Sequence, residues 1–100
     1  MSISSAERIA IEKLSSKLLK VGRTGTLTCT LINGKSAIFS WTRDGRLIQD
    51  SERIQVLNTK RSSILSIDDI ESPDAGNYTC IATNNVSEDR SSATLDVEGW

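Results

Sequence analysis

Acidic side chains are the first candidates for chemistry in this chain, because the sequence contains no histidine. A histidine base and histidine metal ligands are therefore excluded. The acids gather in two clusters, Asp68-Asp69 with Glu71, and Glu88-Asp89. Neither cluster has the spaced oxygen ligands of a calcium loop, so we interpret both as solvated loop charge. The sequence predicts no catalytic residue, no metal site and no cofactor.

Glycine spacing and net charge also argue against several classes of ligand. Gly22 and Gly25 do not have the spacing of a phosphate-binding loop, and a β-turn explains them. The chain has 12 basic and 13 acidic residues, a net charge of −1, which argues against nucleic-acid binding. We expect no small-molecule substrate. No apolar run is long enough to cross a bilayer and no signal peptide is recognised, so we expect an excised domain of a longer protein.

The two cysteines lie in stretches where apolar and polar residues alternate. Alternation around Cys29 places it on the apolar face of a strand, and alternation around Cys80 places it on the same face as Tyr78 and Ala82. Trp41 follows Cys29 by twelve residues in a further apolar stretch. The pattern therefore predicts two strands whose cysteines face each other with a tryptophan between them.

Further alternating runs divide the rest of the chain into short strands. Asn33-Gly34 and Asp44-Gly45 separate two of these runs, and both dipeptides favour turns because their residues tolerate positive φ. The predicted strands cover residues 9–11, 14–20, 25–32, 38–43, 47–48, 53–57, 63–67, 77–82 and 89–97.

One hairpin register can be predicted between strands 53–57 and 63–67. Placing Val56 opposite Leu65 pairs two apolar residues on the inner face. The same register places Leu57 opposite Ile64 on the outer face. The loop between the two strands then lies at residues 58–63.

Several of these residues together resemble an immunoglobulin domain. Cys29, Trp41, Leu65 and the run Asp74-x-Gly76-x-Tyr78-x-Cys80 are similar to its cysteine pin, core and tyrosine corner. The resemblance spans residues 9–97. The cysteines are 51 positions apart, which leaves no room for the C″ insert of a variable domain and favours the intermediate I-set. The resemblance implies an all-β, Greek-key β-sandwich of two antiparallel sheets with one inter-sheet disulfide.

The resemblance also implies roles for individual residues. Cys29 and Cys80 would form the disulfide, which indicates an oxidising compartment. The alternative is a pair of buried free thiols in an intracellular, muscle-type immunoglobulin domain. The Tyr78 hydroxyl would form a hydrogen bond with the backbone near Asp74, and Asp74 would pair with Arg53. We expect residues 1–8 to be a loose segment, residues 9–97 to form the domain, and residues 98–100 to begin a linker.

Three phrases carry a closer resemblance. Residues 39–45, 62–67 and 76–82 are similar to immunoglobulin domains of the Down syndrome cell adhesion molecule (Dscam) family, especially its shortened arthropod members. The phrases consist largely of core residues. The resemblance implies a cell-surface recognition protein whose variable amino-terminal domains bind identical copies on another cell. This function is isoform-specific homophilic adhesion.

Two sequons bear on which surface could bind a partner. Asn77-Tyr78-Thr79 and Asn85-Val86-Ser87 satisfy the acceptor pattern for N-glycosylation, although such short motifs also arise by coincidence. Asn77 points outward from its strand. A glycan there would cover the face formed by strands 38–43, 77–82 and 89–97, which would make that face a poor site for a flat protein contact.

The opposite face is formed by strands 9–11, 25–32, 63–67 and 53–57, which are strands A, B, E and D of the immunoglobulin pattern. This face is the better candidate for self-association. Isolated exposed apolar residues are normal, so these positions could also be plain surface. Our hypothesis is an antiparallel, two-fold contact in which Lys60 and Arg61 pair with acids of a second copy, such as Asp50 or Glu52. The outward candidates on this face are Thr26, Thr28, Thr30, Gln55, Leu57, Ile64 and Ser66.

The leading functional interpretation is therefore an extracellular recognition module of an adhesion receptor, at the outer face of the plasma membrane. Its partners would be a second copy of itself in trans and neighbouring immunoglobulin domains of the same chain. One alternative is a receptor domain that binds a different ligand through loops at one end of the sandwich. Another is a structural spacer, either in an extracellular array or in a muscle filament.

Overall fold

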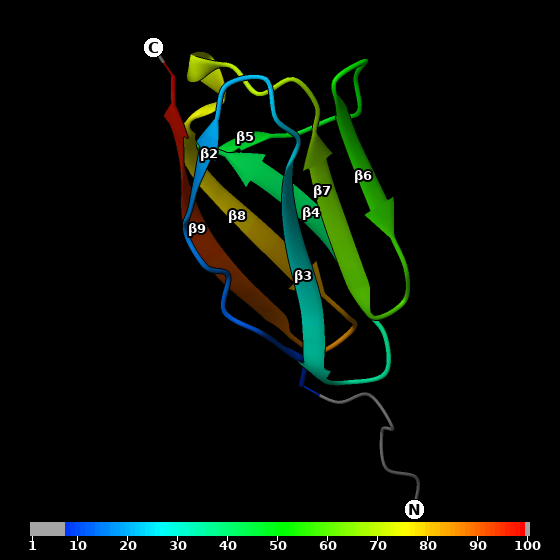
Figure 1. The fold of residues 1–100 in the computed structure, drawn as a ribbon. Helices are drawn as coiled ribbons and strands as arrows, with labels where there is room; N and C mark the ends of the chain where they lie inside the picture. Colours follow the sequence, from blue (N-terminus) through cyan, green and yellow to red (C-terminus); the bar gives the residue numbers. More distant parts are fainter. Residues whose placement is uncertain (1–7, 100) are drawn as a thin grey trace, which may run out of the picture.

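The computed structural model describes residues 8–99, which form two packed β-sheets (Figure 1). Residues 1–7 and Trp100, within the predicted loose segment and linker, lie outside the described residues. The four-stranded sheet has the order β1 (Ala10–Ile11), β3 (Gly25–Asn33), β7 (Ser62–Ile67), β6 (Ile54–Asn58). The five-stranded sheet has the order β2 (Lys17–Lys20), β9 (Glu88–Glu98), β8 (Gly76–Thr83), β4 (Ile38–Arg43), β5 (Arg46–Leu47). The predicted all-β immunoglobulin sandwich is confirmed.

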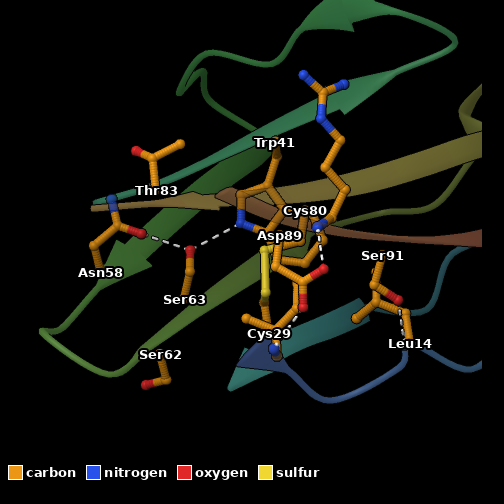
Figure 2. The surroundings of a disulfide bond; sticks show 12 residues. Leu14, Cys29, Trp41, Asn58, Ser62, Ser63, Cys80, Thr83, Asp89 and Ser91 are labelled. Atoms are coloured by element: carbon orange, nitrogen blue, oxygen red, sulfur yellow. Dashed lines mark hydrogen bonds between the residues drawn. A yellow bond between two sulfur atoms is a disulfide. The ribbon is translucent and has the colours of Figure 1, made fainter. Parts of the chain in front are cut away.

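The first two strands belong to different sheets. Strand β1 pairs with β3, whereas β2 pairs with β9 in parallel. Between them, side chains of the β9 strand accept hydrogen bonds from the crossing backbone (Figure 2). The Ile11 amide donates to Asp89 Oδ2 over 2.9 Å, and the Leu14 amide donates to Ser91 Oγ over 2.8 Å. Side-chain oxygens thus accept the hydrogen bonds that a neighbouring strand would otherwise accept. The segment before Lys17 therefore does not have to pair as a strand.

Several strand boundaries differ from those predicted. The second strand starts at Lys17 instead of Leu14, for the reason just given. The fifth strand covers Arg46–Leu47 instead of residues 47–48, because the turn at Asp44-Gly45 is only two residues long. The last strand includes Glu98, which pairs with Lys20 of β2, so the strand continues into the predicted linker.

Local turn chemistry and register agree with the sequence. Asp44 has φ 51° and Gly45 has φ 86°, which is the geometry of a two-residue hairpin. Val56 lies opposite Leu65 and Leu57 opposite Ile64, which confirms the register predicted for the β6–β7 hairpin. The loop joining β6 and β7 comprises residues 59–61, which is shorter than predicted.

The core lies between the two sheets and consists of the inward side chains of both. Ile70, on the connection between β7 and the 3₁₀ turn η1 (Ser72–Asp74), closes one end of it and is fully buried. The buried apolar residues are Ile9, Ile11, Leu27, Cys29, Phe39, Trp41, Leu65, Ile67, Ile70, Tyr78, Cys80, Ala82, Ala93 and Leu95.

Candidate interaction surface

The disulfide and its neighbours hold the two sheets in register beneath the candidate surface. Cys29 and Cys80 are bonded, with 6.4 Å between their Cα atoms. Trp41 Nε1 donates a 2.8 Å hydrogen bond to the buried Ser63 Oγ, and Ser63 Oγ donates to Asn58 Oδ1 (Figure 2). Sequence analysis missed Ser63. The signal was a buried tryptophan, whose indole N–H requires an acceptor on the facing strand.

At the other end of the sandwich, Asp74 organises the approach to β8. The Tyr78 hydroxyl donates to the Asp74 carbonyl over 2.6 Å, which is the contact expected of the tyrosine corner. Arg53 donates to both carboxylate oxygens of Asp74, each over 3.1 Å. The same guanidinium also donates to the carbonyls of Asp68 and Asp69, so it links the start of β6 to the connection that follows β7.

The environment of this corner lowers the pKa of Asp74 and raises that of Tyr78. Burial disfavours the charged form of Asp74, but hydrogen bonds from Arg53 and from the Glu71 amide, together with the Arg53 and Arg43 charges, lower its pKa overall. Burial of the phenol raises the pKa of Tyr78. Both groups are structural, because the Asp74 carboxylate and the Tyr78 hydroxyl are already committed to internal partners.

None of the outward side chains of β3, β7 and β6 is charged, and we call this surface the neutral face. The ammonium of Lys17, on β2, donates to the Thr26 carbonyl over 2.7 Å. Register places Thr28, Ile64 and Leu57 in one row across the three strands. Leu57 is 65% exposed, whereas Ile64 is only partly exposed. A quarter of the whole chain is charged, so the lack of charge on these strands is a distinct feature of this surface. The outward side chains of the neutral face are Thr26, Thr28, Thr30, Ile32, Gln55, Leu57, Ser62, Ile64 and Ser66.

Two members of the neutral face were not predicted. Ile32 continues the outward positions of β3 and is 62% exposed. Ser62 lies opposite Thr30. Both could have been found by extending the alternation of each strand by one position. Ile32 adds apolar area at one end of the face, beyond the predicted Leu57 and Ile64 pair.

Charges of opposite sign lie at the two ends of the β6–β7 hairpin. Lys60 and Arg61 are exposed on the loop that joins the strands. Neither forms an ion pair within residues 8–99. The other end of the hairpin carries the exposed acids Asp50 and Glu52 before β6, and Asp68 and Asp69 after β7.

The free edge of β6 is covered by the loop that precedes it. The Val56 amide donates to Asp50 Oδ1 over 3.2 Å, so this predicted partner of Lys60 already has an internal role. The Ile54 amide donates to Ser51 Oγ, and the Ser51 amide donates to the Ile54 carbonyl. A covered edge disfavours pairing with a strand of another chain. Self-association through this sheet would therefore use its face.

One sequon asparagine, Asn77, lies in the five-stranded sheet, and the other, Asn85, lies in a turn that joins two of its strands. Asn77 is exposed near the start of β8, and its amide donates to Asp44 Oδ1. Asn85 is exposed in the turn between β8 and β9, where the Asn84 amide donates to the Ser87 carbonyl. Glycans at these positions would shield the sheet opposite the neutral face.

Residues 8–99 have neither a candidate metal site nor a candidate membrane-spanning helix. They contain no cluster of three or more acidic, cysteine or histidine side chains suited to a metal ion. They contain no helix with the length and apolar character needed to cross a membrane.

Comparison with known proteins defines the class. The sequence profile of the immunoglobulin I-set domain matches residues 9–97. Titin domain M4 superimposes with a TM-score of 0.87 and 26% identity, covering 95% of this chain and all of that one. The fold, the disulfide and the corner thus define an I-set sandwich. The chain belongs to the immunoglobulin I-set domain family.

Relatives of known name fall into two groups. Chicken neural cell adhesion molecule 1 is 34% identical over 76 residues, which is 74% of this chain and 7% of that protein. Chicken smooth-muscle myosin light chain kinase is 28% identical over 82 residues, which is 82% of this chain and 4% of that protein. The chain thus spans less than a tenth of either relative. The word kinase describes that whole protein and not the segment that matches this chain.

Proposed function

We propose that this domain is an extracellular recognition module of a cell-surface adhesion receptor, and that it binds a second copy of itself through the neutral face. The observation that carries the proposal is a sheet face without charge that exposes Leu57 and Ile32. The similarity to a neural cell adhesion molecule supports the adhesion class. Isoform-specific recognition of the Dscam type rests on the three core phrases of the sequence.

The ends of the β6–β7 hairpin favour an antiparallel arrangement. Consider two copies face to face, related by a two-fold axis that lies in the plane of the contact and perpendicular to the strands. The Lys60-Arg61 loop of one copy then meets the other end of the hairpin in its partner. That end carries Glu52 and Asp68. Opposite charges then meet at both rims of the contact, whereas a parallel arrangement would place like charges together. The charges would set orientation more than affinity.

The contact should be weak for an isolated domain. A face of three short strands buries less than the roughly 1,600 Å² of a standard interface. Serine and threonine side chains make much of the neutral face polar, which favours reversible binding. Many copies on two apposed membranes would supply the strength through avidity. The candidate glycan at Asn77 lies on the other sheet and leaves this contact open.

Sedimentation equilibrium of the oxidised domain, from micromolar to high-micromolar concentration, tests the proposal. We expect the wild type to dimerise and the double variant Leu57→Asp, Ile64→Asp to remain monomeric while it keeps its fold. The matched control is Ile38→Asp, Leu47→Asp, which places the same charges at exposed apolar positions of the other sheet. If both variants dimerise like the wild type, the face is wrong. A wild type that stays monomeric throughout contradicts homophilic binding by this domain.

A structural spacer is the second candidate. It is supported by the similarity to titin domains and to a smooth-muscle kinase. A spacer in a cytosolic filament would carry neither glycan nor disulfide. Expression of the longer natural protein in its own cells, followed by glycosidase treatment and thiol labelling, separates the two candidates. Glycan together with blocked thiols contradicts the filament spacer, and free thiols without glycan support it.

A further inference from the structure

A groove lies at the end of the sandwich where β4 begins and β8 ends. Its volume is about 770 Å³, and three loops form it: the loop between β3 and β4, the loop between β6 and β7, and the turn between β8 and β9. This volume is within the usual range for ligand sites. Two of these loops are fixed to each other, because the Ala37 amide of the β3–β4 loop donates to the Lys60 carbonyl of the β6–β7 loop over 2.9 Å.

The charge of the groove has one sign. Lys35 and Lys60 line it from two different loops, and no aspartate or glutamate is among the lining residues. Both lysines are exposed, and neither forms an ion pair within the described part of the chain. The whole chain has slightly more acids than bases, so two cations without an acid are a local feature. The groove therefore complements an anionic ligand.

The neutral part of the lining indicates the ligand class. Ile38 is 76% exposed and offers an aliphatic surface beside Thr83, its partner across the β4–β8 ladder. The Asn58 side chain is held in place because its Oδ1 accepts a hydrogen bond from the buried Ser63 (Figure 2). The lining contains no aromatic ring on which a sugar ring or a base could stack. Amide groups, an aliphatic surface and two cations suit a peptide that carries carboxylates and an aliphatic side chain.

We propose that this groove binds an acidic segment of a partner protein, with Lys35 and Lys60 contacting its carboxylates and Ile38 contacting an aliphatic side chain. The groove lies at the end of the sandwich and includes the outer surface of β4, and it shares only Lys60 with the contact proposed for the neutral face. The Asn85 sequon lies on its rim, so a glycan at that position would compete with the peptide. Unglycosylated protein is therefore the correct material for a test.

The test is an NMR titration of the ¹⁵N-labelled, oxidised 100-residue chain at low ionic strength. The probe is the peptide acetyl-Glu-Leu-Glu-amide, and its isosteric control is acetyl-Gln-Leu-Gln-amide. We expect the acidic peptide to shift the amide signals of Ala37, Ile38, Thr59 and Thr83 at low millimolar concentration. The neutral peptide should not shift them.

Variants separate groove binding from general attraction to basic surface. Lys35→Gln, Lys60→Gln should weaken the acidic peptide by about fivefold to tenfold, the effect of two exposed ion pairs. The matched control Lys13→Gln, Lys20→Gln removes two exposed lysines elsewhere and should leave the affinity unchanged. Equal effects of the two variants, or equal shifts from both peptides, overturn the proposal. Shifts caused by glucuronate but not by the acidic peptide overturn it in favour of an acidic sugar.

Discussion

The indole N–H of Trp41 donates to the hydroxyl of Ser63 across the two sheets, over 2.8 Å and away from solvent. Ser63 also lies opposite Cys29 in the β3–β7 ladder. The tryptophan, the serine and the disulfide therefore form one unit that joins the sheets at their centre. The hydroxyl accepts from Trp41 and donates to Asn58. Its removal leaves the buried indole N–H of Trp41 without a partner, whereas the exposed Asn58 side chain can bind water.

We expect Ser63→Ala to lower the free energy of unfolding by about 1–3 kcal/mol, the cost of an unsatisfied buried donor. Urea denaturation followed by tryptophan fluorescence measures the change. Ser66→Ala, on the outer face of the same strand, is the control and should change the free energy by less than about 0.5 kcal/mol. Equal effects of the two variants would show that the hydrogen bond adds nothing.

The Cys29–Cys80 disulfide closes a loop with a sequence separation of 51 residues. Its removal by Cys29→Ala, Cys80→Ala should lower the free energy of unfolding by roughly 4 kcal/mol, from the added chain entropy of the unfolded state. The midpoint of urea denaturation should fall accordingly. Reduction of the wild type with a thiol is the companion measurement, and it should produce a shift in the same direction. An unchanged midpoint in both experiments would mean that packing alone fixes the core.

Asp74 should make the domain sensitive to acid. Its pKa is lower in the folded protein than the ordinary value of 3.8, so the unfolded chain binds the proton more tightly. The resulting stabilisation is present above about pH 4 and is lost as the pH falls through the folded-state pKa. We expect Asp74→Asn to be less stable at pH 7 by about 2 kcal/mol, a value reduced because Arg53 is partly exposed.

Urea denaturation of the wild type and Asp74→Asn from pH 2 to pH 7 tests this expectation. The difference between the two proteins should shrink toward pH 2. Asp96→Asn, on the exposed surface of β9, should follow the wild type at every pH. A constant difference across the range would contradict ionisation of Asp74 as the cause.

The turn between β4 and β5 depends on a glycine. Gly45 has φ 86°, and no atom lies within 4 Å of the position that a β-carbon would occupy. Gly45→Ala should therefore cost about 1 kcal/mol through backbone strain alone. Thermal denaturation measures this loss. Gly45→Asn should recover part of it, because asparagine tolerates positive φ. An alanine variant as stable as the wild type would show that the turn can change its conformation.

Glycosylation at Asn77 and Asn85 can be checked by secretion from animal cells. We expect Asn77→Gln and Asn85→Gln each to lose the mass of one glycan, because both side chains are exposed. Intact-mass spectrometry before and after glycosidase treatment gives the count. The double variant should have the mass of the bare polypeptide. A wild type without added mass would remove the argument that glycans shield the five-stranded sheet.

The sequence alone determined the class of fold and much of its local geometry. Alternation around Cys29 and Cys80 assigns each side chain to the inner or outer face of its strand, because the period of a strand is two residues. Asp44-Gly45 specifies its turn through backbone sterics, and the pairing of Val56 with Leu65 follows from matching apolar residues. These features depend on residues close together in the chain, so a single sequence contains the information.

Only the tertiary structure decided which distant groups meet. The buried indole N–H of Trp41 requires an acceptor, but only the packing of β7 across from Trp41 decides that the acceptor is Ser63. The anchoring of Leu14 by Ser91 depends on β9 lying beside the amino-terminal segment, 77 residues away in sequence. The groove unites Lys35 with Lys60 because three loops converge at one end of the sandwich. Packing of the two sheets sets these juxtapositions, and alternation within one strand contains no information about them.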